Sequence, residues 1–318
     1  MPGYLALALI WGSSFLFIKI GVRELHPMYV SLGRVATGAL TVLVILLATR
    51  GKLPRDLRTW GHLAFVGAVG VAIPFTLFAY GELHVSSVLA GIWNATTPLF
   101  ALPVAALVFR TERMTPRRVV GILIGFVGVL VVLGVWQGVG GSQLTGQLMC
   151  MGAAVCYGIA IPYQRRFLPG QPGSAIAIPA GQLLAGTLML LVVAPLTAGA
   201  PPAPTSLSLD VVGSVLALGA LGTGLAFVFN FRVISVAGAT TSASVTYLIP
   251  IVATAIGVLV LGETLHWYEP AGAAVVLAGV AVSQGFLRWR RRPEVQPGGV
   301  PDRSLVTTTR SSRAPSSR

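Results

Sequence analysis

Long apolar runs, separated by short charged or turn-forming segments, extend over most of the chain. A helix needs about 20 apolar residues to cross about 30 Å of hydrocarbon, and these runs have that length. The pattern therefore predicts an all-α integral membrane protein with ten transmembrane helices. The predicted spans lie near residues 4–22, 29–49, 60–80, 86–109, 118–136, 144–163, 174–198, 210–231, 238–261 and 270–287.

The composition of the chain excludes a water-soluble protein. Only 10% of the residues are charged, whereas a globular protein carries about 25%, and the mean hydropathy is +0.82. The formal net charge of +13 would suit a nucleic-acid partner, but the basic residues lie between the apolar runs and in the tail. We therefore expect this charge to face anionic lipids of the inner leaflet, and we expect no nucleic acid.

Sequence motifs of the common enzyme classes do not occur in the chain. The P-loop, zinc-protease and nucleophile-elbow patterns are missing. Cys150 and Cys156 lie six residues apart in one apolar run, and the four histidines are scattered, so we expect no metal site. The sequence thus predicts that the protein is not an enzyme and holds no cofactor.

Lysine and arginine are distributed unevenly between alternate loops. If the N-terminus is cytoplasmic, nineteen of the 22 basic residues fall in inner loops and the tail, and only Arg23 falls in an outer loop. This bias predicts that both termini face the cytoplasm. Residues 288–318 contain mainly Arg, Ser, Thr, Pro and Gly and are expected to form a disordered basic tail. The tail then acts either as an anchor to anionic lipid or as a plain stop-transfer end.

The two halves of the sequence match when the chain is shifted by about 150 residues. Among the matches, Glu112 falls on Glu263 and Gly121 falls on Gly272. The match predicts two five-helix units, at 3–137 and 143–287. Because five is odd, the second unit enters the bilayer from the opposite side, which gives an inverted repeat.

Several matched residues also carry a family resemblance. They are Trp11-Gly12-Ser13-Ser14-Phe15, Arg34, Pro98, Glu112 and Gly121 in the first half, and Pro250, Glu263 and Gly272 in the second. With these residues the chain resembles the drug/metabolite transporter superfamily, specifically its ten-helix EamA-like members. The resemblance implies a permease of the bacterial inner membrane with a central cavity between the halves. In the superfamily an arginine is usual in span 2, but its partner in the second half here is Gln182.

Members of this superfamily commonly export amino acids and other metabolites. The resemblance therefore predicts a secondary transporter of small metabolites or amino-acid-like compounds that works by alternating access and exports its substrate. Two alternatives stay open, which are import of a nutrient and a non-transporting membrane scaffold or lipid-handling protein. Polar groups in the middle of the membrane would favour the permease.

Two prolines lie at matched positions in the middle of predicted spans. Pro98 and Pro250 are expected to kink their helices and to free the carbonyls of Asn94 and Thr246. These carbonyls line a cavity, or nearby hydroxyl groups satisfy them; two equivalent prolines favour the cavity. The residues beside the kinks, and thus the leading substrate contacts, are Trp93, Asn94, Thr246 and Tyr247.

Further contacts are expected from aromatic and polar residues of the other spans, since aromatic faces with a few amides suit a modest organic substrate. Each aromatic side chain has core packing as its alternative role. These candidates are Trp11 and Ser14 in span 1, Arg34 in span 2, Phe78 in span 3, Tyr157 and Tyr163 in span 6, and Asn230 in span 8.

Charged residues within the spans are few, and such residues are functional by default. Lys19 and Arg34 could together form a cationic lining that favours anionic substrate groups. Alternatively, Lys19 extends its ammonium to the outer surface, and Arg34 caps freed carbonyls and holds helices together. The surface position is favoured for Lys19, and both roles stay open for Arg34. No carboxylate lies deep within a span, so the proton exchange on a first-helix glutamate that small multidrug transporters use is not expected. Glu82 and Glu263 are expected near the outer surface and Glu112 near the inner one, where carboxylates can stay hydrated. Glu112 and Glu263 are expected to pair with neighbouring basic or backbone groups and not to relay protons. Protons stay a candidate for the coupling ion.

Overall fold

The computed structural model describes residues 2–137, 141–168, 176–230, 233 and 245–285. Within these residues every regular element is helical and there is no strand. The tail prediction for 288–318 lies outside the described residues. The α-helices are α1 (Pro2–Gly21), α2 (Pro27–Ala48), α3 (Leu57–Gly67), α4 (Ile73–Gly81), α5 (Ser87–Ala95), α6 (Thr97–Pro103), α7 (Pro116–Val132), α8 (Gly141–Phe167), α9 (Ala177–Ala198), α10 (Leu209–Gly219), α12 (Ile249–Leu261) and α13 (Tyr268–Gln284).

Short turns of other helix types join or extend these elements. They are the π-helical turns η1 (Ala68–Ala72), η2 (Val104–Val108) and η5 (Ala220–Leu225), and the 3-10 turns η3 (Val135–Gln137), η4 (Pro204–Ser206) and η6 (Val245–Tyr247). A π turn thus follows α3 directly after Gly67 and follows α10 directly after Gly219. These glycines match in the two halves, so the repeat extends to local irregularities of the helices.

Seven helical stretches of the described chain are long and apolar enough to cross a membrane. They are Gly3–Gly21, Pro27–Ala48, Leu57–Gly81, Ser87–Val108, Gly141–Phe167, Ala177–Ala198 and Leu209–Asn230. The remaining predicted spans correspond to α7 and α13, of 17 residues each, and to the shorter apolar stretch Val245–Leu261. The predicted all-α membrane fold is confirmed.

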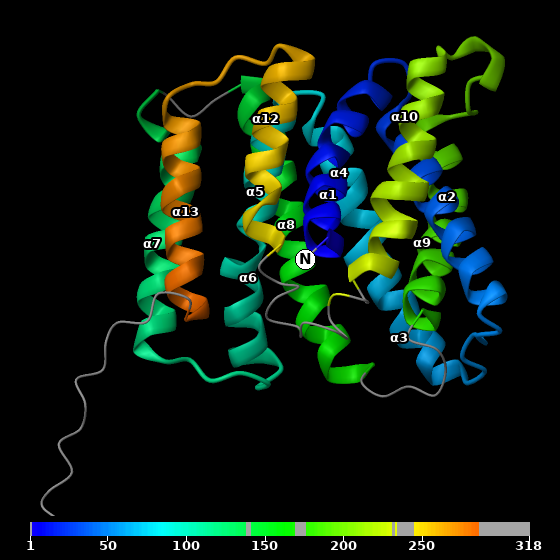
Figure 1. Ribbon diagram of the computed structural model, residues 1–318, viewed down its shortest axis with the longest axis horizontal. Helices are drawn as coiled ribbons and strands as arrows, with labels where there is room; N and C mark the ends of the chain where they lie inside the picture. Colours follow the sequence, from blue (N-terminus) through cyan, green and yellow to red (C-terminus); the bar gives the residue numbers. More distant parts are fainter. Residues whose placement is uncertain (1, 138–140, 169–175, 231–232, 234–244, 286–318) are drawn as a thin grey trace, which may run out of the picture. The chain divides into compact units, whose positions relative to one another are not determined.

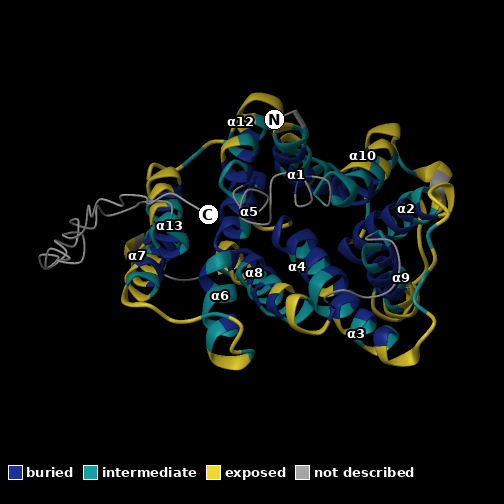
Figure 2. Cartoon of the chain, turned by 60° about the horizontal axis from the view of Figure 1, so that its bottom comes forward, coloured by how far each residue is buried: buried dark blue, intermediate teal, exposed yellow. Residues whose placement is uncertain are grey.

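The outward faces of these helices are apolar. Leu47, Leu196 and Leu259 are 71%, 79% and 82% exposed, whereas a water-soluble protein rarely exposes large contiguous apolar surface. Buried residues lie where α1, α4, α5 and α8 meet (Figure 2). The protein is therefore built to be surrounded by lipid, with its polar interior groups shielded between helices.

Glycines pair α7 with α13, which lie side by side (Figure 1). A Cβ atom at Gly128 would lie 2.9 Å from the Gly272 carbonyl oxygen, and one at Gly272 would lie 2.9 Å from the Gly128 oxygen. Gly121 and Gly279 meet in the same reciprocal way, at 2.6 Å. Residue numbers rise along one helix as they fall along the other, so the two equivalent helices run antiparallel about a local two-fold axis.

The same reciprocity relates the helices nearer the centre. A Cβ at Gly38 of α2 would lie 3.2 Å from the carbonyl oxygen of Gly219, and one at Gly186 of α9 would lie 3.1 Å from that of Gly67. The second helix of each half therefore packs against the third helix of the other half, as an inverted repeat requires. Glycine permits these close approaches because it has no side chain.

The helical path is interrupted next to both prolines, at the positions where the sequence predicts kinks. α5 ends at Ala95 and α6 begins at Thr97, so Pro98 opens a new helix, and Pro250 likewise stands in the first turn of α12. Proline has no N–H to donate to the carbonyl four residues earlier, whereas the first turn of a helix accommodates it well. At Pro98 the Thr97 hydroxyl donates to the Asn94 carbonyl at 2.8 Å. At that break a nearby hydroxyl group therefore satisfies the Asn94 carbonyl.

Candidate functional site

Arg34 of α2 lies buried where the two halves of the protein meet. Its Nε donates to the Thr223 hydroxyl oxygen of η5 at 3.0 Å, which links the first half to the second. Its guanidinium carbon lies 3.6 Å from the centroid of the Phe75 ring of α4, a cation–π contact. Among the described residues, Thr223 is the one hydrogen-bond partner of the Arg34 guanidinium, and it uses Nε. Both Nη groups therefore stay available for a further acceptor.

Aromatic rings from two other helices extend this contact. The Tyr157 ring of α8 lies 6.5 Å from that of Phe75 and 6.2 Å from that of Phe78, between ring centroids. Phe78 in turn meets Phe15 of α1 edge-on at 5.5 Å. We call Arg34, Phe75, Phe78, Tyr157 and Thr223 the Arg34 cluster. It places one cation beside a wall of rings, between segments of both halves.

Three of the predicted contacts, Arg34, Phe78 and Tyr157, therefore come together. Ser14 lies close by, since a Cβ at Gly222, next to Thr223, would be 2.9 Å from its hydroxyl oxygen. That hydroxyl donates to the Ile10 carbonyl at 3.0 Å. Trp11 is half-buried and packs against the core that contains Phe78.

Trp93 is fully buried in the same core, and no described residue accepts a hydrogen bond from its Nε1. Its neighbour Asn94 is partly exposed. Asn230, Thr246 and Tyr247 are also partly exposed, on either side of residues 234–244, which lie outside the described chain. The structure therefore leaves the role of these five residues a prediction.

Tyr163 lies in a separate cluster from Arg34. Its hydroxyl is 2.7 Å from Nδ1 of His62, and its ring lies 4.2 Å from that of Phe65 and 4.6 Å from that of Phe167. The ring of Phe109 joins them at 5.9 Å. These rings come from α3, from the residue that directly follows η2 and from the end of α8. We call this end of the bundle the Tyr163 end.

The opposite end, which we call the Lys19 end, differs from the sequence-based expectation. Lys19 is partly exposed, and its ammonium is bound to the protein, since it donates to the carbonyls of Glu82 at 2.6 Å and Val85 at 2.8 Å. Glu82 is not hydrated but fully buried, at 0% exposure. The expectation for Glu82 failed because α1 and α8 pack over the end of α4, which local sequence does not report.

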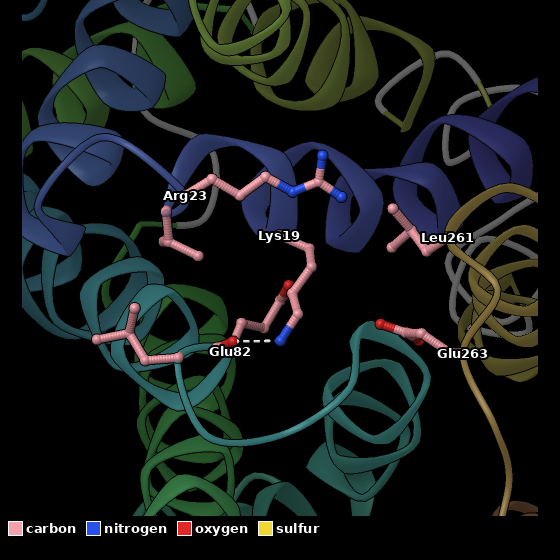
Figure 3. A pocket seen from close by; sticks show the side chains of 7 residues that line it. Lys19, Arg23, Glu82, Leu261 and Glu263 are labelled. Atoms are coloured by element: carbon pink, nitrogen blue, oxygen red, sulfur yellow. Dashed lines mark hydrogen bonds between the residues drawn. The ribbon is translucent and has the colours of Figure 1, made fainter.

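Glu263 and Glu112 both bond neighbouring groups of the protein. Glu263 accepts from the Ser87 amide at 2.8 Å and the Val88 amide at 3.2 Å, so it caps the start of α5. Glu112 forms an ion pair with Arg118 at 2.8 Å. Lys19, Glu82 and Glu263 border a cavity of about 270 Å³ together with Val22, Arg23, Leu83 and Leu261 (Figure 3).

Sequence reasoning missed Phe75 and Thr223 of the Arg34 cluster. Phe75 stands one helical turn before Phe78, so the shared face of α4 was an available signal. Thr223 follows Gly222, which matches Gly70 in the first half, but no pattern in the sequence joins it to Arg34. Among the described residues, no three His, Cys, Asp or Glu side chains gather to hold a metal ion.

The apolar, membrane-length helices and the buried cation among them define a multi-span membrane protein. The model of the EamA-like transporter family matches residues 3–134 and 144–284, and the chain belongs to this family. A probable terminal-alkyne amino-acid exporter of Streptantibioticus cattleyicolor is 30% identical over 91% of this chain and 94% of its own. The uncharacterized inner membrane transporter YedA of Escherichia coli is 29% identical over 92% and 93%.

A solved crystal structure is similar in fold. It superposes with a TM-score of 0.63 at 21% identity, and the match covers 88% of this chain and 94% of that one. At this identity the likeness supports the fold alone. It agrees with the helical architecture described above.

Proposed function

We propose that this transporter exports small amino-acid-like metabolites by alternating access, with the substrate held at the Arg34 cluster. The observation that carries the proposal is the buried Arg34 guanidinium, whose Nη groups bond no described residue. A charge inside a membrane protein is costly and is retained for function by default. A guanidinium binds carboxylates in a bidentate geometry, through two parallel hydrogen bonds. The neighbouring rings suit the apolar part of an organic molecule.

The substrate class rests on this chemistry together with one relative. That relative is named as an amino-acid exporter, and an amino acid presents the carboxylate that Arg34 would bind. Phe78 and Tyr157 then contact the side chain of the substrate. Thr223 holds the guanidinium in place, because its hydroxyl accepts from Nε and leaves the outer nitrogens for the ligand.

We propose that the Tyr163 end faces the cytoplasm of a bacterial cell and that the Lys19 end faces outward. The contacts of His62, Phe109 and Phe167 with Tyr163 bring three basic loops to one end of the bundle. These loops carry most of the loop arginines, and such loops favour the cytoplasm. The relative in Escherichia coli is named as an inner membrane transporter, which supports the same membrane here.

Alternating access follows from the inverted repeat in this proposal. Two halves of opposite orientation can exchange their conformations, which opens a central site to each side in turn. Arg34 and Thr223 belong to different halves, so a substrate on Arg34 contacts the boundary at which such a movement occurs. A receptor or a membrane enzyme has no comparable need of this symmetry.

The experiment follows efflux from bacterial cells that produce the chain and are loaded with labelled phenylalanine or propargylglycine. We expect the wild-type chain to speed the loss of label, and Arg34→Gln to abolish this effect. Arg118→Gln, which removes a surface arginine, is the matched control and keeps the effect. Faster accumulation of label would favour import, and no change in either direction would favour the scaffold.

A further inference from the structure

Glu82 is a buried carboxyl group that the Arg34 cluster does not use. Both of its side-chain oxygens are buried, and no described residue donates a hydrogen bond to either of them. A carboxylate without such bonds is very costly in a buried place, whereas the neutral acid is far less so. A buried polar group without a partner calls for an explanation, and a transporter offers one.

The charged and titratable groups around Glu82 are engaged elsewhere. Lys19 of α1 donates to two carbonyls of the turn between α4 and α5 and forms no ion pair with a described carboxylate. Glu263, after α12, is bound to amides of α5. The guanidinium of Arg34 lies on Phe75, and Cys150 of α8 is a buried free cysteine. Arg23 borders the cavity.

These surroundings favour the protonated form of Glu82, which follows the membrane-spanning stretch Leu57–Gly81. Burial raises the pKa of the Glu82 carboxyl well above its ordinary value, and the positive charge of Lys19 opposes this increase. The group is therefore held between two states, since burial favours the acid and Lys19 favours the carboxylate.

We propose that the Glu82 carboxyl is a proton-binding site that couples this transporter to a proton gradient, with Lys19 as the cation that neutralises its deprotonated form. The inference rests on the transport function proposed above. Figure 3 shows the Lys19 ammonium between the side chains of Glu82 and Glu263. The cavity of about 270 Å³ that these residues border is large enough for several water molecules, which can carry the proton to and from the group.

The proton step changes the bonds of Lys19. When the Glu82 acid releases its proton to water, a carboxylate remains, and the nearby ammonium gains a strong acceptor. Lys19 then turns from the carbonyls of Glu82 and Val85 to the carboxylate, which loosens the attachment of α1 to the turn between α4 and α5. When a proton returns, the acid re-forms and Lys19 binds the carbonyls again. The proton thus selects between two arrangements of the Lys19 end.

The first test measures the proton on Glu82 without any substrate. Infrared difference spectra of the purified chain in nanodiscs, recorded across a pH series, report carboxylic acid groups that lose their protons. We expect a band that titrates above the ordinary range of glutamate, and we expect Glu82→Gln to abolish it while Glu112→Gln keeps it. Lys19→Gln shifts the titration to higher pH, because it removes the opposing charge. A band that survives in Glu82→Gln would overturn the proposal.

The second test measures coupling in vesicles loaded with labelled phenylalanine or propargylglycine. One proton exchanged per substrate gives an about tenfold substrate gradient for each pH unit imposed. We expect the ratio of flux with and without the pH gradient to exceed one for wild type and Glu112→Gln, and to be one for Glu82→Gln. A Glu82→Gln ratio equal to wild type would overturn the proposal. Absence of flux from the wild-type chain would instead refute the transport function, and the infrared band would still decide the proton site.

Discussion

The packing of α7 against α13 gives a sharp prediction about stability. An alanine at Gly279 places its Cβ 2.6 Å from the Gly121 carbonyl oxygen and also against the Gly125 amide. Both neighbours are backbone atoms, so no side chain can rotate away and the helices must separate. Overpacking of this kind costs about 1–3 kcal/mol, and we expect the upper end of that range because the contact is made on two sides.

The matched control is Gly61→Ala in α3, where a Cβ would meet nothing within 4 Å. Both substitutions gain the same helix propensity, about 1 kcal/mol, so their difference isolates the packing cost. Reversible unfolding in mixed detergent micelles measures both free energies of unfolding. By the reciprocity of the contact, Gly121→Ala should destabilise the protein as much as Gly279→Ala does. Equal stability of Gly279→Ala and Gly61→Ala would refute the close helix contact.

Three further predictions concern charged groups. Arg34→Lys should weaken substrate binding by about tenfold or more, since lysine cannot form a bidentate pair with a carboxylate. Unchanged affinity in an equilibrium binding assay would contradict the site. Glu263→Gln should lower the free energy of unfolding by about 1 kcal/mol, because the glutamine amide caps α5 less well than the carboxylate does. Glu112→Gln breaks a partly exposed ion pair and should lower that free energy by less. Thermal unfolding compares the two variants. The Thr59 amide donates to the Asp56 carboxylate at the start of α3 and lowers the pKa of that carboxyl. The stability that this helix cap contributes is therefore fully present above the ordinary pKa of aspartate, and it is lost as the pH falls through the lowered pKa. Hydrogen exchange at the start of α3 should quicken over that acidic range in the wild type and show no such step in an Asp56→Asn variant.

The sequence was sufficient for the all-α membrane fold and for the matched glycines, because both depend on local composition and on the order of residues. Apolar runs of membrane length predict helices whatever their neighbours are. Gly121 and Gly272 could be matched from the sequence, and their contacts with the other half show why glycine stands there.

Other features depend on contacts that the sequence does not report. The burial of Glu82 arises from α1 and α8, which pack over the end of α4, so its place near the end of a span was a poor guide. The hydrogen bond from Arg34 to Thr223 joins residues 189 positions apart. The helix breaks before Pro98 and Pro250 were expected as kinks, because proline is compatible with either outcome.

A structure with a bound amino acid tests the central claim most directly. The account predicts that the carboxylate of the ligand lies within hydrogen-bond distance of the Arg34 guanidinium, with its side chain against Phe78 and Tyr157. A ligand bound elsewhere, such as in the cavity beside Lys19, with Arg34 still on Thr223 and Phe75 alone, would contradict it.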